Sequence, residues 1–137
     1  EAFMPALTKD RNTQMKDAEL IAVPVAAGAV IYGGAMVVAN ATGFAAPAST
    51  ALNLTYLGRA EESVNNAAGA NGAKTALVRR KQAFFFANLA ADALTQADLG
   101  KTVYMVDDQT VAKTNGGGTR SAGGKLVEFT ADGVWVE

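Results

Sequence analysis

Glycine, asparagine, aspartate and proline interrupt the apolar segments of this chain at intervals of roughly ten residues, a spacing typical of short strands joined by turns. The 137 residues include 14 glycines and three prolines. About nine or ten segments between these turns have the two-residue alternation of a half-buried strand. The pattern predicts a mainly β protein, either a compact β-barrel or a β-sandwich, with one or two short helical turns. It does not determine the strand order.

Local signals agree most closely between residues 95 and 113. Thr95 and Asp98 have the spacing of a capping box, and Gly100 is suited to end the helical turn that the box begins. Alternation after this turn predicts a strand in which Val103 and Met105 share one face. The segments that follow the turn are a strand over 102–106, an acidic turn over 107–109 and a strand over 110–112.

Four other segments give sharper expectations than the rest. Residues 19–25 alternate as a strand, and Pro24 places that strand at a sheet edge because proline cannot donate to a ladder. Residues 65–72 predict an exposed loop. The run over 73–87 changes its alternation near Arg79-Arg80-Lys81, which predicts a bulge or a turn there. A hairpin is expected about Ala131-Asp132-Gly133.

The length favours one β-rich domain over residues 18–137, preceded by an N-terminal arm over 1–17. Residues 4–17 have neither strand nor helix periodicity, so they are expected to be extended. Glu1, Ala2 and Phe3 precede Met4, which we interpret as the natural start, the first three residues being left by recombinant expression.

Composition narrows the possible functions. The chain has no cysteine and no histidine, which excludes disulfides and thiolate chemistry and makes zinc or copper sites improbable. A net charge of −1 provides no global field for nucleic acid or an anionic membrane. No apolar segment is long enough to span a bilayer. We therefore expect a soluble protein made in a cytoplasm, with no enzymatic activity and no cofactor.

Two groups of residues resemble binding motifs only in part. Asp107 and Asp108 are adjacent, but the residues after them do not supply the spaced oxygen ligands of a calcium loop, so a turn is favoured. The segments 115–120 and 122–125 are rich in glycine. Lys125 is followed by Leu126 and a predicted strand, unlike the lysine of a phosphate-binding loop. We interpret both glycine-rich segments as flexible hairpin tips.

The basic triplet Arg79-Arg80-Lys81 lies close to Phe84-Phe85-Phe86 in the sequence. Cationic grooves with exposed rings bind single-stranded nucleic acid, so this segment is the candidate surface for such an activity. Consecutive aromatic residues on a strand point to both faces, however, which predicts that one or two of them are in the core. Trp135 is expected to be a core or interface anchor.

Several strand and turn segments resemble those of small structural proteins encoded in the head-gene region of tailed bacteriophages and prophages, the capsid decoration or cement proteins. The segments are Ile21–Gly28, Gly58–Glu62, Ala97–Lys101, Val106–Ala112 and Gly133–Val136. The resemblance extends over nearly all of the chain from Met4 onward, but its motifs contain no catalytic chemistry. It implies a β-rich protein that binds the outside of a capsid shell, commonly as a trimer at threefold positions.

The resemblance implies the major capsid protein as partner, a homotrimeric state and the capsid surface of a virion as location. An arm of this kind often pairs with the shell, so the expected shell contacts are Thr8, Lys9, Arg11, Asn12 and Thr13. The residues expected at the oligomer interface are Phe84, Phe86, Tyr104 and Trp135. A tail-tube or head-completion subunit is the alternative, and a nucleic-acid-binding module is a third possibility.

Overall fold

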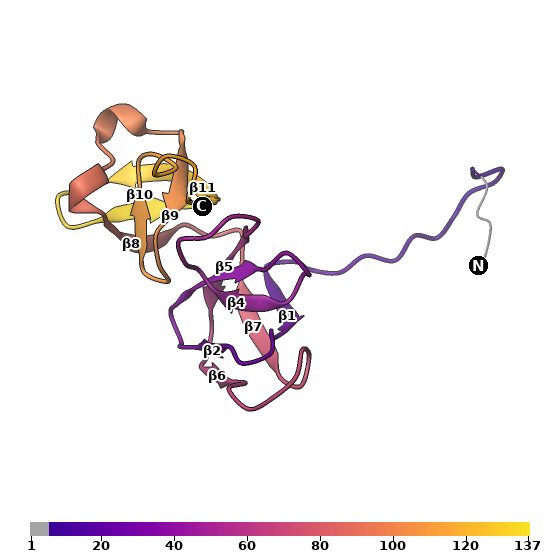
Figure 1. The fold of residues 1–137 in the computed structure, drawn as a ribbon. Helices are drawn as coiled ribbons and strands as arrows, with labels where there is room; N and C mark the ends of the chain where they lie inside the picture. The colour runs from indigo at the N-terminus through magenta and orange to yellow at the C-terminus, as the bar shows by residue number, and fades with distance from the viewer. Residues whose placement is uncertain (1–5) are drawn as a thin grey trace.

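The computed structural model describes residues 6–137 (Figure 1). Within this range the chain forms twelve short strands and two 3-10 turns, arranged as a five-stranded sheet, a closed five-stranded barrel and a two-stranded ribbon. The fold is therefore mainly β, as the spacing of turns predicts. Residues 1–3 and Met4, interpreted above as an expression remnant and a natural start, lie outside the described residues.

The five-stranded sheet contains residues from the first part of the chain, in the order β1-β7-β5-β3-β4, and all neighbouring strands are antiparallel. Its strands are β1 (Leu20–Pro24), β3 (Met36–Ala39), β4 (Ala45–Pro47), β5 (Thr55–Ala60) and β7 (Thr75–Arg79). Because β1 is an edge strand, the prediction from Pro24 is confirmed. The ribbon pairs β2 (Val30–Ile31) with β6 (Val64–Asn65).

The barrel contains residues from the last part of the chain, in the order β10-β8-β12-β11-β9. Its strands are β8 (Phe84–Asn88), β9 (Thr102–Met105), β10 (Thr110–Ala112), β11 (Ala122–Phe129) and β12 (Val134–Val136). Strands β11 and β12 form the antiparallel hairpin predicted about Asp132. Strands β8 and β10 pair in parallel, whereas the other neighbours in the barrel are antiparallel.

The 3-10 turns η1 (Ala90–Asp92) and η2 (Gln96–Asp98) connect β8 to β9. At η2 the predicted capping box is present, because the Thr95 amide donates to the Asp98 carboxylate over 2.8 Å. Gly100 has φ +80°, which suits the residue that ends the turn. Val103 and Met105 of β9 are both fully buried, as the alternation of this strand predicts.

Two hydrophobic clusters form the core, and β3 contributes to both. Met36 and Val38 pack with the interior of the barrel, whereas Val37 packs with residues of the five-stranded sheet. All three side chains are fully buried because both faces of β3 are covered. The Met36 amide also donates to the carbonyl of Asp108 in the barrel over 2.8 Å. The sheet therefore packs against the barrel through β3, by apolar side chains and by a main-chain hydrogen bond.

The run over residues 73–87 contains two strands that belong to different sheets. Strand β7 ends at Arg79 in the five-stranded sheet, and β8 begins at Phe84 in the barrel. Lys81, between them, has φ +60°. Of the two predicted alternatives, a bulge or a turn near residues 79–81, the structure has the turn.

Residues 6–18 contain no strand and extend away from the body of the protein (Figure 1). Their side chains are exposed except that of Ala18, which is half-buried. The described part of the predicted arm therefore has the expected extended form. No helix within residues 6–137 is long and apolar enough to cross a membrane.

Candidate functional site

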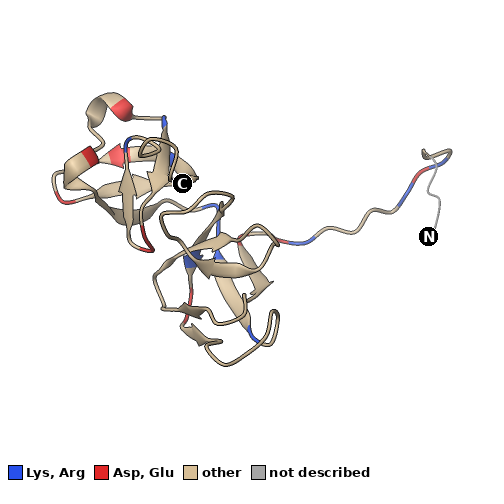
Figure 2. Cartoon of the chain, in the orientation of Figure 1, with Lys and Arg blue, Asp and Glu red and all other residues tan. Residues whose placement is uncertain are grey.

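The side chains of the arm are exposed from residue 6 to residue 17, so the arm is not packed against the body of the protein. A local backbone hydrogen bond joins the Thr13 amide to the Arg11 carbonyl over 3.0 Å. Acidic and basic residues both occur along the arm, which lies apart from the body (Figure 2). The predicted shell contacts are all exposed: Thr8, Lys9, Arg11, Asn12 and Thr13. A partner can therefore reach them without displacing the fold.

The arm joins the body at a fixed point beside β1. The Glu19 amide donates to the Asp17 carboxylate over 3.1 Å, and the Glu19 carbonyl accepts from the Arg80 amide over 2.7 Å. The second bond extends the pairing of β1 with β7. The C-terminal end of the arm is therefore held to the body by hydrogen bonds at Glu19.

The predicted oligomer residues divide between the core and the surface. Phe84 and Phe86 are 7% and 4% exposed and pack inside the barrel. Tyr104 is half-buried on β9, and Trp135 is 37% exposed on β12. The structure therefore does not bring these four side chains together on one surface. Phe84 and Phe86 confirm the expectation that some of the three phenylalanines are in the core.

The exposed partner of Trp135 is Phe85. The two residues face each other across the β8–β12 pair, and their ring centroids are 5.3 Å apart with planes inclined by 59°. The Phe85 ring lies where a Cβ on Gly133 would be, so glycine at this position allows the ring to cover the hairpin. We call Phe85 and Trp135 the aromatic pair. Alternation along β8 indicated one exposed ring, but the pairing depends on strand register, which the sequence does not reveal.

The basic and aromatic segment over 79–86 does not form a surface of stacked rings and cations. The guanidinium groups of Arg79 and Arg59 both form ion pairs with Glu61. The Arg59 guanidinium lies 5.2 Å above the centre of the Phe84 ring. Hydrogen bonds from Arg79 and then Arg59 lower the pKa of the Glu61 carboxyl below its usual value. Local sequence patterns do not indicate that Arg59 and Glu61 contact this segment.

The adjacent aspartates have structural partners. The Asp107 carboxylate accepts from the Gln109 amide over 2.9 Å, which is an Asx turn, and the Asp108 carbonyl accepts from Met36. Across the described residues, acidic side chains do not gather in groups of three or more that could hold a metal ion. The predicted turn is therefore present at this position.

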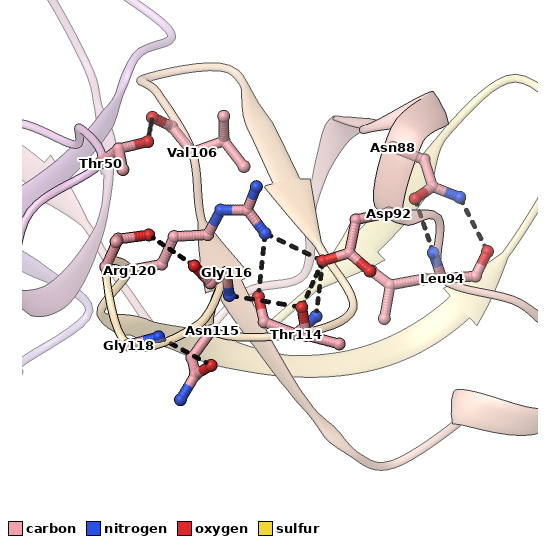
Figure 3. A network of polar contacts seen from close by, with 11 residues as sticks. Thr50, Asn88, Asp92, Leu94, Val106, Thr114, Asn115, Gly116, Gly118 and Arg120 are labelled. Carbon is pink, nitrogen blue, oxygen red and sulfur yellow. Dashed lines mark hydrogen bonds and ion pairs between the residues drawn. The ribbon is translucent and has the colours of Figure 1, made fainter.

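The glycine-rich loop over 114–120 is braced by a polar network that the sequence did not indicate (Figure 3). The Asp92 carboxylate accepts from the Thr114 hydroxyl and from Arg120, the latter over 2.9 Å. These hydrogen bonds lower the pKa of the Asp92 carboxyl below its usual value, and the bond from Thr114 has the larger effect. The Asn115 carbonyl accepts from the amides of three residues within the loop, so hydrogen bonds define its shape.

Comparisons of the chain with family models, with curated proteins and with solved structures found no match.

Proposed function

We propose that this protein is a non-enzymatic structural component of a phage virion, which binds the outside of the capsid and bridges major capsid subunits. The observation that carries the proposal is an exposed, extended arm anchored to a compact β body. Extended segments add to the sheets of a partner through main-chain hydrogen bonds. The strand and turn segments that resemble those of decoration proteins support the same function.

Stabilisation in this proposal arises from linked binding and requires no chemical step. A protein that binds the expanded shell and not its dissociated subunits shifts the equilibrium toward the assembled shell. Three linked arms in a homotrimer raise the effective concentration of each arm at its site. The arm contributes binding, while the body holds the arms at a fixed spacing.

Deleting residues 4–14 should abolish binding to purified, expanded capsids of the cognate phage while leaving the circular dichroism spectrum of the body unchanged. Cosedimentation with the capsids measures this. The matched control scrambles residues 4–14 and so retains arm length and charge. Capsid occupancy equal to that of the intact protein after the deletion would rule out the arm as the shell contact.

The proposed trimer places the aromatic pair at its interface, because exposed aromatic rings are enriched in such contacts. Changing Phe85 and Trp135 to serine should weaken self-association, measured as mass in solution by light scattering. The control is Tyr32→Ser, since Tyr32 is 66% exposed on another part of the body. If the double variant still has the mass of three chains, this interface is wrong. If the unmodified protein forms a hexamer or a polymer, a tail-tube subunit is favoured instead.

A further inference from the structure

A cleft lies where the five-stranded sheet meets the start of the barrel. It has a volume of about 380 Å³ and is lined by Arg59, Arg79, Gln82, Ala83 and Phe84. Strands β5 and β7 contribute the two arginines, which pair across the sheet at the same register position. Basic residues are visible in this region in Figure 2. The lining of the cleft includes no described residue of the arm or of the aromatic pair.

The two guanidinium groups retain donors that face no acceptor in the described chain. Arg79 uses its Nε and one terminal nitrogen on Glu61, over 3.3 and 3.2 Å, and Arg59 uses one terminal nitrogen on the same carboxylate. The second terminal nitrogen of each arginine has no partner within residues 6–137. The side chains are 39% and 32% exposed, so solvent reaches the cleft.

Main-chain donors add to these groups. Gln82 and Ala83 belong to the turn between β7 and β8, and their amides donate to no acceptor in the described part of the chain. Both residues are exposed and line the cleft. The cleft lining therefore combines two guanidinium groups with a turn whose amides are unpaired within residues 6–137, and both kinds of donor can bind an oxyanion.

The charge at the cleft is positive although the chain is weakly acidic. Two arginines with Glu61 give a net charge of +1. Among the neighbouring residues, Arg80 and Lys81 add two positive charges, whereas Asp17 and Glu19, whose charges act on Arg79, and Glu62 remove three. The excess positive charge is therefore confined to the cleft itself, where the two arginines outnumber Glu61 and attract an anionic group.

The aromatic geometry distinguishes a protein ligand from a nucleic acid. Single-stranded nucleic acid binds where bases stack on exposed rings. Phe84 is 7% exposed and is covered by Arg59, whereas the exposed Phe85 points to the opposite face of β8. The cleft therefore offers donors for an anion without a ring for stacking.

The geometry points to this cleft as a binding site for a carboxylate on an acidic protein segment, held between the guanidinium groups of Arg59 and Arg79. Arginine binds carboxylates through paired, charge-assisted hydrogen bonds, which gives both affinity and orientation. Glu61 occupies part of the donor set, so it both positions the two arginines and competes with the ligand. This site does not depend on the proposed capsid function.

Titration of the full-length protein with acetylated, amidated tetraglutamate at constant ionic strength tests the site. The amide signals of Gln82 and Ala83 in nuclear magnetic resonance spectra should shift and saturate. Arg79→Gln and Arg59→Gln should each weaken binding about fivefold, the scale of an exposed ion pair. The matched control is Lys74→Gln, which removes the same charge from an exposed position outside the cleft and should change binding less than about twofold.

Weaker binding by the arginine variants could also result from misfolding, so a variant expected to bind more tightly is needed. Glu61→Gln removes the competing carboxylate charge and should tighten tetraglutamate binding about threefold. Absence of saturable shifts, or equal weakening by Lys74→Gln and Arg79→Gln, would overturn the site. Tighter binding of an oligothymidylate of equal charge at the same amides would show a nucleic-acid surface instead. Deletion of residues 4–14, which retains Asp17 and Glu19, should leave tetraglutamate binding unchanged, so this test is separate from that of the capsid contact.

Discussion

Tyr56 on β5 has a hydroxyl group that is buried without a hydrogen-bond partner in residues 6–137. Its ring packs against the cluster that joins the sheet to the barrel. Burial, and secondarily the charge of Glu137, raise the pKa of Tyr56 from 10.0 to about 12. The Tyr56 hydroxyl therefore loses its proton at a higher pH in the folded protein than in the unfolded chain.

Replacing Tyr56 by phenylalanine should raise the free energy of unfolding at pH 8 by about 1 kcal/mol, because a buried hydroxyl without a partner is costly. Because the folded pKa is raised, the contribution of the neutral phenol is complete below pH 10 and is lost as the pH rises toward 12. Tyr56→Phe should therefore lose less stability between pH 8 and pH 11 than the unmodified protein.

Urea unfolding at both pH values measures the two effects of Tyr56→Phe. The control is Tyr104→Phe on the half-buried β9 position, which should change stability by less than about 0.5 kcal/mol. A Tyr56→Phe variant less stable at pH 8 than the unmodified protein would show that the hydroxyl has a stabilising partner.

Asn66 is a buried polar residue within a segment that the sequence predicts to be an exposed loop. The asparagines and glycines over 65–72 predicted an exposed loop, and most of that segment is exposed, but Asn66 is 1% exposed. Its side-chain amide donates to the carbonyls of Ala26 and Ala70 over 2.9 and 3.0 Å. Ala26 is 40 positions away, and local propensity carries no information about such a partner.

Strand β5 approaches β7 more closely at Gly58 than a side chain permits. A Cβ on Gly58 would overlap the carbonyl oxygen of Arg79, which belongs to the backbone and cannot rotate away. The register of β5 with β3 also shifts beside this glycine. Gly58 therefore allows the bulged strand to pair on both of its edges.

Gly58→Ala should lower the free energy of unfolding by about 2–3 kcal/mol, because the added methyl must separate β5 from β7. Chemical denaturation measures the loss. The matched control is Gly33→Ala, where the nearest atom to the new methyl would be 3.6 Å away, an ordinary contact, and the expected change is below about 1 kcal/mol. Similar losses in the two variants would show that the cost is general to glycine replacement.

Most individual elements were predictable because their signals are local. The capping box at Thr95, the hairpin about Asp132 and the edge position of Pro24 each depend on a few neighbouring residues. The division of residues 73–87 between two sheets was not predictable, since alternation reports the face of a residue and not the identity of its sheet. The part of Arg59 in the cleft and its ion pair with Glu61 were missed for a related reason, because contacts between strands depend on the register.

The strand order of the molecule could not be predicted from the sequence, and neither could the contact between the sheet and the barrel. Met36 and Val38 bury their side chains in the cluster that also fills the barrel. Because this cluster spans both bodies, loss of either one exposes apolar surface of the other. We therefore expect one cooperative unfolding transition.

Trp135 is the only tryptophan of the chain, and it reports on the barrel alone. Its fluorescence and the far-ultraviolet circular dichroism of all strands should follow the same urea transition. Met36→Ala should lower the free energy of unfolding measured by both signals by about 2–5 kcal/mol, the range for a buried methionine. Separate midpoints for the two signals in the unmodified protein would mean that sheet and barrel unfold independently.

The chain passes from the sheet to the barrel only once within residues 6–137, through residues 80–83. During synthesis, every strand of the five-stranded sheet therefore emerges from the ribosome before the first barrel strand does. The sheet can pair completely at that stage, yet Met36 and Val38 still face water. The nascent chain thus has an apolar surface that awaits the barrel, and the interval until residue 136 emerges is when a chaperone would bind or premature association between chains would occur.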